Sequence, residues 1–208
     1  MTQFSAKLQY HGQSGALNES ISDVVGMMTK QHRLLQTSAM SDWLIGGPLL
    51  GPEVHGKAIR SMAAPGTAYD DPVLGKDPQP AHMRDYVDSP DDNGGVHINS
   101  GIPNRAFFLS ATGIGGYSWD KPGDIWYEVV DKRLSSRAEF QDFANATVAV
   151  AGELYGVGGQ VQSIVRDAWV EVGIIVPSAP MVSLSTSGPV KPAPADIWPN
   201  RPAIVTSR

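Results

Sequence analysis

The sequence has 208 residues and a mass of 22.2 kDa, which suits one domain of ordinary size with a tail, or two small domains. A hydrophobic content of 41% and a net charge of −5 argue against wholesale disorder and against a general affinity for nucleic acid or anionic membranes. Without cysteine, the chain can form neither disulfides nor thiolate metal sites. No apolar run approaches the ~20 residues of a membrane span, and the residues after Met1 show no signal-peptide pattern.

The first predicted element is a helix over residues 14–36, which Ser14 or Asn18 could cap. Apolar residues recur there at steps of three and four, at Leu17, Ile21, Val24 and Met28. Glu19 and Asp23 are four residues apart and therefore share another face of this helix. Both carboxylates could hold a metal, or one could bind it while the other orients a neighbouring ligand. A solvated helix face is the alternative.

A long irregular segment follows over residues 46–95. It is dense in glycine, proline and aspartate and shows little periodicity, and such segments often form functional surfaces. Its last five residues, DDNGG, predict a turn that lets Asp92 fold back onto His97. That contact would fix the tautomer of the imidazole and favour its charged form, which suits oxyanion stabilisation. A purely structural His–Asp contact is the alternative.

Helical patterns return after this segment. We expect a helix capped by Asn99 or Ser100, and three more over residues 124–134, 137–155 and 160–172, the last two ending at Gly156 and Gly173. From Val176 onward the chain is rich in proline. These patterns predict a mainly α fold, with a helical domain over residues 1–175 that includes the long irregular insertion, and a disordered proline-rich tail over residues 176–208.

Two segments carry a resemblance to a known family. Residues 15–23, GALNESISD, and residues 92–102, DNGGVHINSGI, resemble two motifs of the thermolysin-like zinc metallopeptidases, in the family's order. Residues 43–46, WLIG, and residues 64–72, APGTAYDDP, are most similar to its shorter, protealysin-like branch. The resemblance runs from Thr2 to Gly173 and implies the α-helical C-terminal part of a catalytic region. It therefore implies a secreted metalloendopeptidase that hydrolyses peptide bonds with metal-activated water.

The resemblance also assigns roles at the metal. Glu19 matches the glutamate that binds the catalytic zinc, and Asp23 matches the aspartate that holds one of the zinc-bound histidines. In the family, two further ligands and the general base come from a His-Glu-x-x-His motif just upstream of the position that matches Thr2. This sequence contains no such motif.

Further roles concern the substrate. Tyr10 and His97 match the pair that hydrogen-bonds the oxyanion of the tetrahedral intermediate, and Asp92 matches the carboxylate that orients the histidine. Arg60 matches the arginine that binds the substrate carbonyl beyond the scissile bond. Ile59 matches a residue that lines the adjoining apolar pocket.

The missing motif changes the expected function of the chain alone. A catalytic zinc needs three protein ligands, and Glu19 is only one. We therefore expect the chain to bind zinc weakly and to lack peptidase activity without a missing N-terminal half that carries His-Glu-x-x-His. The alternative is a non-catalytic module, derived from a peptidase, that binds peptides or a partner protein. A secreted parent enzyme and peptide or protein substrates follow from the resemblance, with no role for nucleic acid or membranes.

Calcium is the second metal that the resemblance brings into question. The positions matching the family's paired-calcium site carry Lys30, Leu44 and Gly47, and only Asp42 is acidic. A lysine among the ligands opposes binding of a cation. We therefore expect no paired calcium site, and at most one calcium ion.

Overall fold

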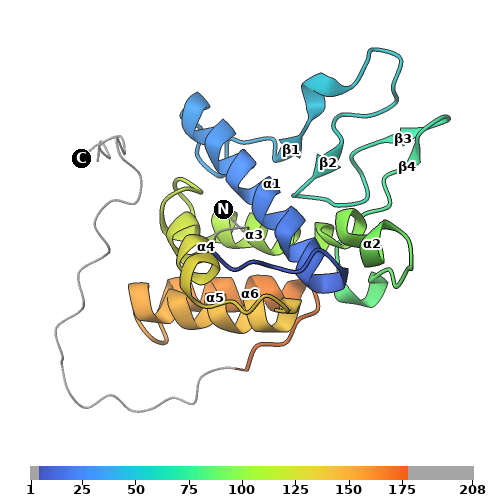
Figure 1. Ribbon diagram of the computed structural model, residues 1–208. Helices are drawn as coiled ribbons and strands as arrows, with labels where there is room; N and C mark the ends of the chain where they lie inside the picture. The colour runs from blue at the N-terminus through green and yellow to red at the C-terminus, as the bar shows by residue number, and fades with distance from the viewer. Residues whose placement is uncertain (1–4, 178–208) are drawn as a thin grey trace, which may run out of the picture.

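The computed structural model describes residues 5–177 (Figure 1). In chain order these form α1 (Gly12–Leu34), β1 (Leu44–Ile45), β2 (Arg60–Ser61), β3 (Asp70–Asp71), β4 (Gly75–Lys76), α2 (Asp92–Asn99), α3 (Gly101–Ile114), α4 (Lys121–Lys132), α5 (Phe140–Tyr155) and α6 (Gln160–Glu171). Two 3-10 turns lie at Gly47–Leu49 and Met83–Asp85. The predicted mainly α fold is confirmed. Of the predicted tail, residues 178–208 lie outside the described residues.

Helix α1 links the two parts of the molecule. In Figure 1 it runs diagonally, with the segment that holds β1 to β4 on one side and α4, α5 and α6 on the other. Its apolar stripe is buried against α2, α3 and α5, with Leu17, Val24 and Met27 almost completely enclosed. The amphipathic pattern read from the sequence therefore places one face of α1 in the core and leaves the face with Glu19 next to the irregular segment.

The C-terminal helices form an aromatic core. Trp126 of α4 stacks on Trp169 of α6 with ring centroids 6.2 Å apart, and Phe143 of α5 packs edge-on against both rings. The indole N–H of Trp169 donates to Thr147 Oγ1 at 2.8 Å, which satisfies a polar group in a fully buried position. In Figure 1, α5 and α6 lie side by side beneath α1. These helices give the domain a rigid base.

Residues 46–91 contain no α-helix, as the lack of periodicity indicated. Strand β1 pairs antiparallel with β2, and β3 pairs antiparallel with β4. Two buried carboxylates organise much of the rest. Asp77 accepts the backbone N–H groups of Gly66, Ala68 and Gln79, and Asp71 accepts those of His55, Val73 and Leu74. Because carboxylates rather than a long strand ladder bind these backbone donors, the segment is ordered without a repeating pattern.

One predicted helix cap was wrong. The N-cap of α1 is His11, and the Ser14 hydroxyl donates to the carbonyl oxygens of Gln9 and His11 instead of accepting a backbone N–H. Ser100 is the N-cap residue of α3, as predicted, but its side chain makes no capping hydrogen bond, and the Asn99 side-chain oxygen accepts the N–H of Val87. Short polar side chains have several local backbone partners, so residue type alone does not identify the one they choose.

Two glycines of α1 provide a stability test. Gly26 is exposed, and a Cβ added there would meet no atom within 4 Å. We therefore expect Gly26→Ala to raise the free energy of unfolding by about 0.5–1 kcal/mol, because alanine loses less backbone entropy in a helix. In Gly15→Ala, the Cβ would collide with the buried Val96 side chain, and a loss of about 1–3 kcal/mol is expected. Urea unfolding followed by circular dichroism measures both changes; equal effects would contradict this packing.

Candidate active site

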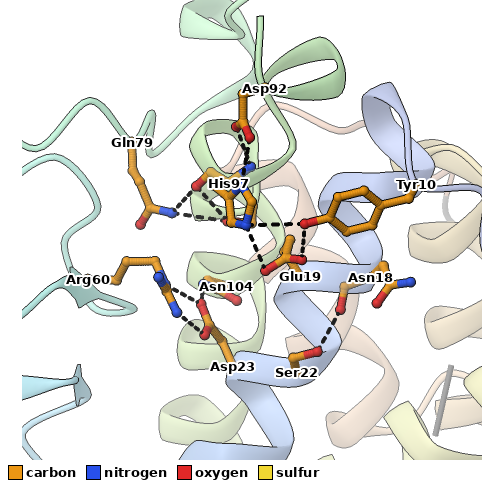
Figure 2. Close-up of polar contacts among 11 residues, drawn as sticks. Tyr10, Asn18, Glu19, Ser22, Asp23, Arg60, Gln79, Asp92, His97 and Asn104 are labelled. Atoms are coloured by element: carbon orange, nitrogen blue, oxygen red, sulfur yellow. Dashed lines mark hydrogen bonds and ion pairs between the residues drawn. The ribbon is translucent and has the colours of Figure 1, made fainter.

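Asp23 on α1 accepts three side-chain hydrogen bonds. Its Oδ2 accepts Arg60 Nε at 2.7 Å and its Oδ1 accepts Arg60 Nη2 at 2.6 Å, while Asn104 Nδ2 donates to Oδ2 at 2.9 Å (Figure 2). The side chain of Asp23 is only 8% exposed and that of Arg60 is 24% exposed. The hydrogen bonds to Asp23 raise the pKa of Arg60 above its ordinary value, so the guanidinium stays charged. This contact joins α1, β2 and α3.

His97 lies on α2 and is held by Asp92, as the sequence indicated. His97 Nδ1 lies 2.6 Å from Asp92 Oδ1, and the backbone N–H of His97 donates to Asp92 Oδ2 at 2.8 Å. Partial burial acts to raise the pKa of Asp92, but the hydrogen bonds from the His97 ring and backbone outweigh it, and the pKa is lowered. Asp92 is therefore ionised at neutral pH and orients the ring through Nδ1.

An unusual backbone conformation makes this contact. Four consecutive residues at the start of α2 have positive φ angles, 53° at Asp92, 50° at Asn93, 86° at Gly94 and 70° at Gly95. L-residues rarely continue in the left-handed region beyond a single position, because Cβ approaches the following carbonyl oxygen. The two glycines avoid that cost, and asparagine tolerates it. The turn points the Asp92 carboxylate back at the backbone N–H and at the ring Nδ1 of His97.

Tyr10 and Glu19 meet His97 on its other side. The Tyr10 hydroxyl donates to Glu19 Oε1 at 2.5 Å and lies 3.1 Å from His97 Nε2, which is 3.6 Å from Glu19 Oε2 (Figure 2). Because the Tyr10 proton goes to a carboxylate, its oxygen can only accept from His97, and Nδ1 already faces Asp92. Partial burial and then the hydrogen bond to Glu19 raise the pKa of Tyr10 to about 12, so its hydroxyl stays protonated.

The remaining predicted site residue, Ile59, directly precedes Arg60. Its N–H donates to the Ile45 carbonyl at 2.9 Å, and its side chain packs over Gly46, where a Cβ would meet Ile59 Cδ1 at 2.7 Å. Ile59 is partly exposed. The structure thus brings Tyr10, Glu19, Asp92 and His97 together and joins Arg60 to Asp23, one helical turn from Glu19, whereas the described contacts of Ile59 are with Gly46 and Ile45.

Two buried amides at this site escaped the sequence analysis. Asn104 on α3 binds Asp23, and Gln79 binds the backbone of the His97 segment. Asn104 follows His97 by seven residues, about two helical turns, and that spacing was the available signal. Gln79 lies in the irregular segment, where no periodicity relates it to His97.

The described residues do not form a complete zinc site. A catalytic zinc takes three protein ligands, usually histidine and carboxylate. Across residues 5–177, no group of three or more His, Asp or Glu side chains could hold a metal ion. Glu19 is the predicted ligand, and its nearest imidazole, His97, is already bound by Asp92 and Tyr10. These residues can therefore supply one ligand of a zinc site but not the complete set.

Lys30 is one of the positions that match the family's paired-calcium site. Its Nζ donates to Asp42 Oδ1 at 2.6 Å and to the Leu44 carbonyl at 3.2 Å. Partial burial alone would raise the pKa of Asp42. The hydrogen bond from Lys30 and the other contacts outweigh burial, so the pKa of Asp42 is lowered. An ammonium group thus binds the carboxylate and carbonyl oxygens that would otherwise suit a cation.

Comparison with known proteins agrees with this geometry. The family described as the thermolysin metallopeptidase α-helical domain matches residues 6–174. The chain is 52% identical over 177 residues to an extracellular metalloprotease of Pectobacterium carotovorum subsp. carotovorum, covering 85% of this chain and 50% of that protein. It is 50% identical over 175 residues to protease PrtS of Photorhabdus sp. (strain Az29), covering 83% and 47%. The solved precursor of protealysin, a metalloproteinase from Serratia proteamaculans, superposes with a TM-score of 0.81 at 55% identity, covering 83% and 53%.

A mainly helical domain with this carboxylate, tyrosine and histidine arrangement defines a metallopeptidase-type domain. The chain belongs to the thermolysin-like metallopeptidase family, in which it corresponds to the α-helical C-terminal domain. The similarity to protealysin supports its place beside the protealysin-like branch. The chain spans about half the length of these relatives. Among the described helices, none is long and apolar enough to cross a membrane.

The left-handed turn can be tested at Gly94. There φ is 86°, and a Cβ would meet the backbone N of Gly12 at 2.9 Å. We expect Gly94→Ala to lower the free energy of unfolding by about 1–3 kcal/mol. Asn93→Gly, in the same turn, should change it by less than about 1 kcal/mol, because glycine accepts the same φ. Urea unfolding measures both variants, and an unchanged midpoint for Gly94→Ala would contradict the left-handed turn.

Thermal unfolding tests whether calcium binds at the oxygens of Asp42 and Leu44 beside Lys30. We expect the midpoint to be the same in EDTA and in millimolar calcium, because the Lys30 ammonium already binds Asp42 and Leu44. A calcium ion at 100 times its Kd would add about 2.7 kcal/mol to the free energy of unfolding. A rise of the midpoint in calcium, but not in magnesium at equal concentration, would contradict the expectation.

Proposed function

We propose that this chain supplies the α-helical half of the catalytic centre of a secreted zinc metalloendopeptidase. The observation that carries the proposal is the convergence of Tyr10 Oη, His97 Nε2 and the Glu19 carboxylate within 3.6 Å of one another. A phenol that keeps its proton and an imidazole oriented by Asp92, beside a carboxylate able to bind a metal, match the requirements of peptide hydrolysis. Relatives named as an extracellular metalloprotease and an extracellular minor metalloprotease support both the class and the location.

In this proposal Tyr10 and His97 stabilise an oxyanion. When substrate separates the Tyr10 hydroxyl from Glu19, its proton becomes available to a developing negative charge, and His97 Nε2–H can donate to the same oxygen. Asp92 keeps the ring in place through Nδ1 and balances its positive charge. The donors are in position before the reaction, so little reorganisation is needed when charge develops.

Arg60 and Ile59 bind the part of the substrate that follows the scissile bond. Arg60 is fixed by two hydrogen bonds to Asp23, so its guanidinium can meet a peptide carbonyl with little loss of side-chain entropy. Ile59 offers a partly exposed aliphatic surface next to it. An apolar side chain after the scissile bond is therefore the expected preference.

The metal would be completed by residues outside this sequence. We propose that Glu19 is one zinc ligand, that Asp23 holds a histidine ligand, and that a His-Glu-x-x-His segment supplies the other ligands and the base. The zinc would supply Lewis-acid chemistry, and the chain alone would bind it weakly and hydrolyse no peptide.

A fusion experiment tests this function. The N-terminal half of the Pectobacterium relative, with its His-Glu-x-x-His segment, is joined ahead of Thr2, and hydrolysis of a quenched fluorescent peptide is measured with zinc. We expect activity from the fusion and none from the 208-residue chain. Glu19→Ala should abolish zinc-dependent activity, and His97→Ala should lower kcat by about 10²–10³-fold.

His55→Ala is the matched histidine control. His55 is exposed, lies outside the site and should leave kcat unchanged. An active fusion in which Glu19→Ala or His97→Ala has no effect would overturn the proposed roles. An inactive, folded fusion, together with peptide binding by the 208-residue chain, would favour the non-catalytic module instead.

A further inference from the structure

Gln79 is a buried amide beneath the His97 segment. Its Nε2 donates to the His97 carbonyl oxygen at 2.7 Å and to Ser100 Oγ at 3.0 Å (Figure 2). The residue is 5% exposed, so water does not compete for these hydrogen bonds. It comes from the irregular segment, eighteen positions before His97.

The direction of this amide follows from its partners. A backbone carbonyl can only accept, so the NH₂ group must face His97, and the oxygen must point away. Gln79 Oε1 is buried and has no hydrogen-bond partner among the residues that the structure describes. A buried unpaired acceptor is costly, and an apolar side chain of similar length would avoid that cost. The benefit of glutamine at this position therefore lies in its two donations to the His97 segment.

The two donations complete the support of His97. Asp92 binds its backbone N–H and its ring, and both contacts lie on the N-terminal side. The carbonyl side is held by Gln79 and by the Ser100 hydroxyl, which donates to the same oxygen at 3.0 Å. His97, Ser100 and Gln79 thus form a closed triangle of hydrogen bonds. Without Gln79, rotation of this peptide group would tilt the ring away from Tyr10.

Gln79 is itself fixed. Its backbone N–H donates to Asp77 Oδ1 at 3.1 Å, and Asp77 also binds two N–H groups of the preceding loop. On the other side, the chain at Gln79 and Pro80 lies directly against the start of α3. A Cβ on Gly101 would meet the Pro80 carbonyl at 2.7 Å and Gln79 Cβ at 3.0 Å. The amide therefore has little freedom to follow a displaced histidine.

We propose that Gln79 is a positioning residue for His97, which rests on the proposed function of His97 at the oxyanion. Through Gln79, the segment that carries Arg60 and the helix that carries His97 hold one fixed geometry. The position of Arg60, which would bind the substrate, is thereby fixed relative to His97, which would bind the oxyanion.

Gln79→Met in the active fusion tests this role. Methionine has similar length and no donor, so we expect kcat to fall by about 10- to 100-fold while KM changes by less than about twofold. Gln162→Met is the matched control, because Gln162 Nε2 donates to the Val148 carbonyl at 3.0 Å, away from the site. It should leave kcat unchanged. An equal effect of the two variants, or an unchanged kcat in Gln79→Met, would overturn the proposal.

A measurement without activity uses NMR of the histidine Cε1–Hε1 groups in the 208-residue chain. There are five histidines, and His97→Asn assigns the signal of His97. In Gln79→Met we expect the His97 signal to shift or broaden and the other four to stay in place. If Gln79→Met fails to fold by circular dichroism, Ser100→Ala, which removes two of the three hydrogen bonds of the triangle, is used for both measurements. An unmoved His97 signal in the folded variant would overturn the proposal.

The two proposals fail in different ways. If His97→Ala retains full activity in the fusion, the proposed function of His97 is wrong, whatever Gln79 does. If His97→Ala loses activity while Gln79→Met keeps normal kcat and an unmoved His97 signal, the function stands and the positioning role of Gln79 is wrong.

Discussion

The site depends first on the buried carboxylate of Asp23. It binds the guanidinium of Arg60 through two hydrogen bonds and the amide of Asn104 through a third, so one side chain joins α1, β2 and α3. A buried charge that lost these partners would be strongly destabilising, because nothing else would offset its desolvation. This constraint keeps the irregular segment against α1 and fixes the position of the Arg60 guanidinium.

A second constraint is the left-handed turn before His97. The turn places conformational cost at Asp92 and Asn93, and its Gly94 packs closely against the backbone of Gly12 at the start of α1. The histidine is then supported from both sides, by Asp92 and by Gln79. Rigid support of this kind is what a preorganised oxyanion site requires.

Much of this arrangement could be read from local spacing. Glu19 and Asp23 share a face because they are one helical turn apart, and Asp92 reaches His97 across a glycine turn. The contacts of Arg60 and Gln79 join segments 37 and 18 residues apart through irregular chain, where no period relates the positions. The predicted cap at Ser14 was wrong, and Ser100 is an N-cap without a side-chain capping bond, because both hydroxyls donate to backbone carbonyls instead.

Carboxylates order the irregular segment by binding its backbone, so the stability of the segment depends little on which residues lie at its surface. Asp71 and Asp77 bind backbone N–H groups, which every residue except proline provides, so the identity of the intervening side chains matters little to these anchors. Val73, bound to Asp71 only through its backbone, leaves 91% of its surface in solvent. The surface of this segment can therefore accumulate substitutions while the backbone that carries Arg60 keeps its shape.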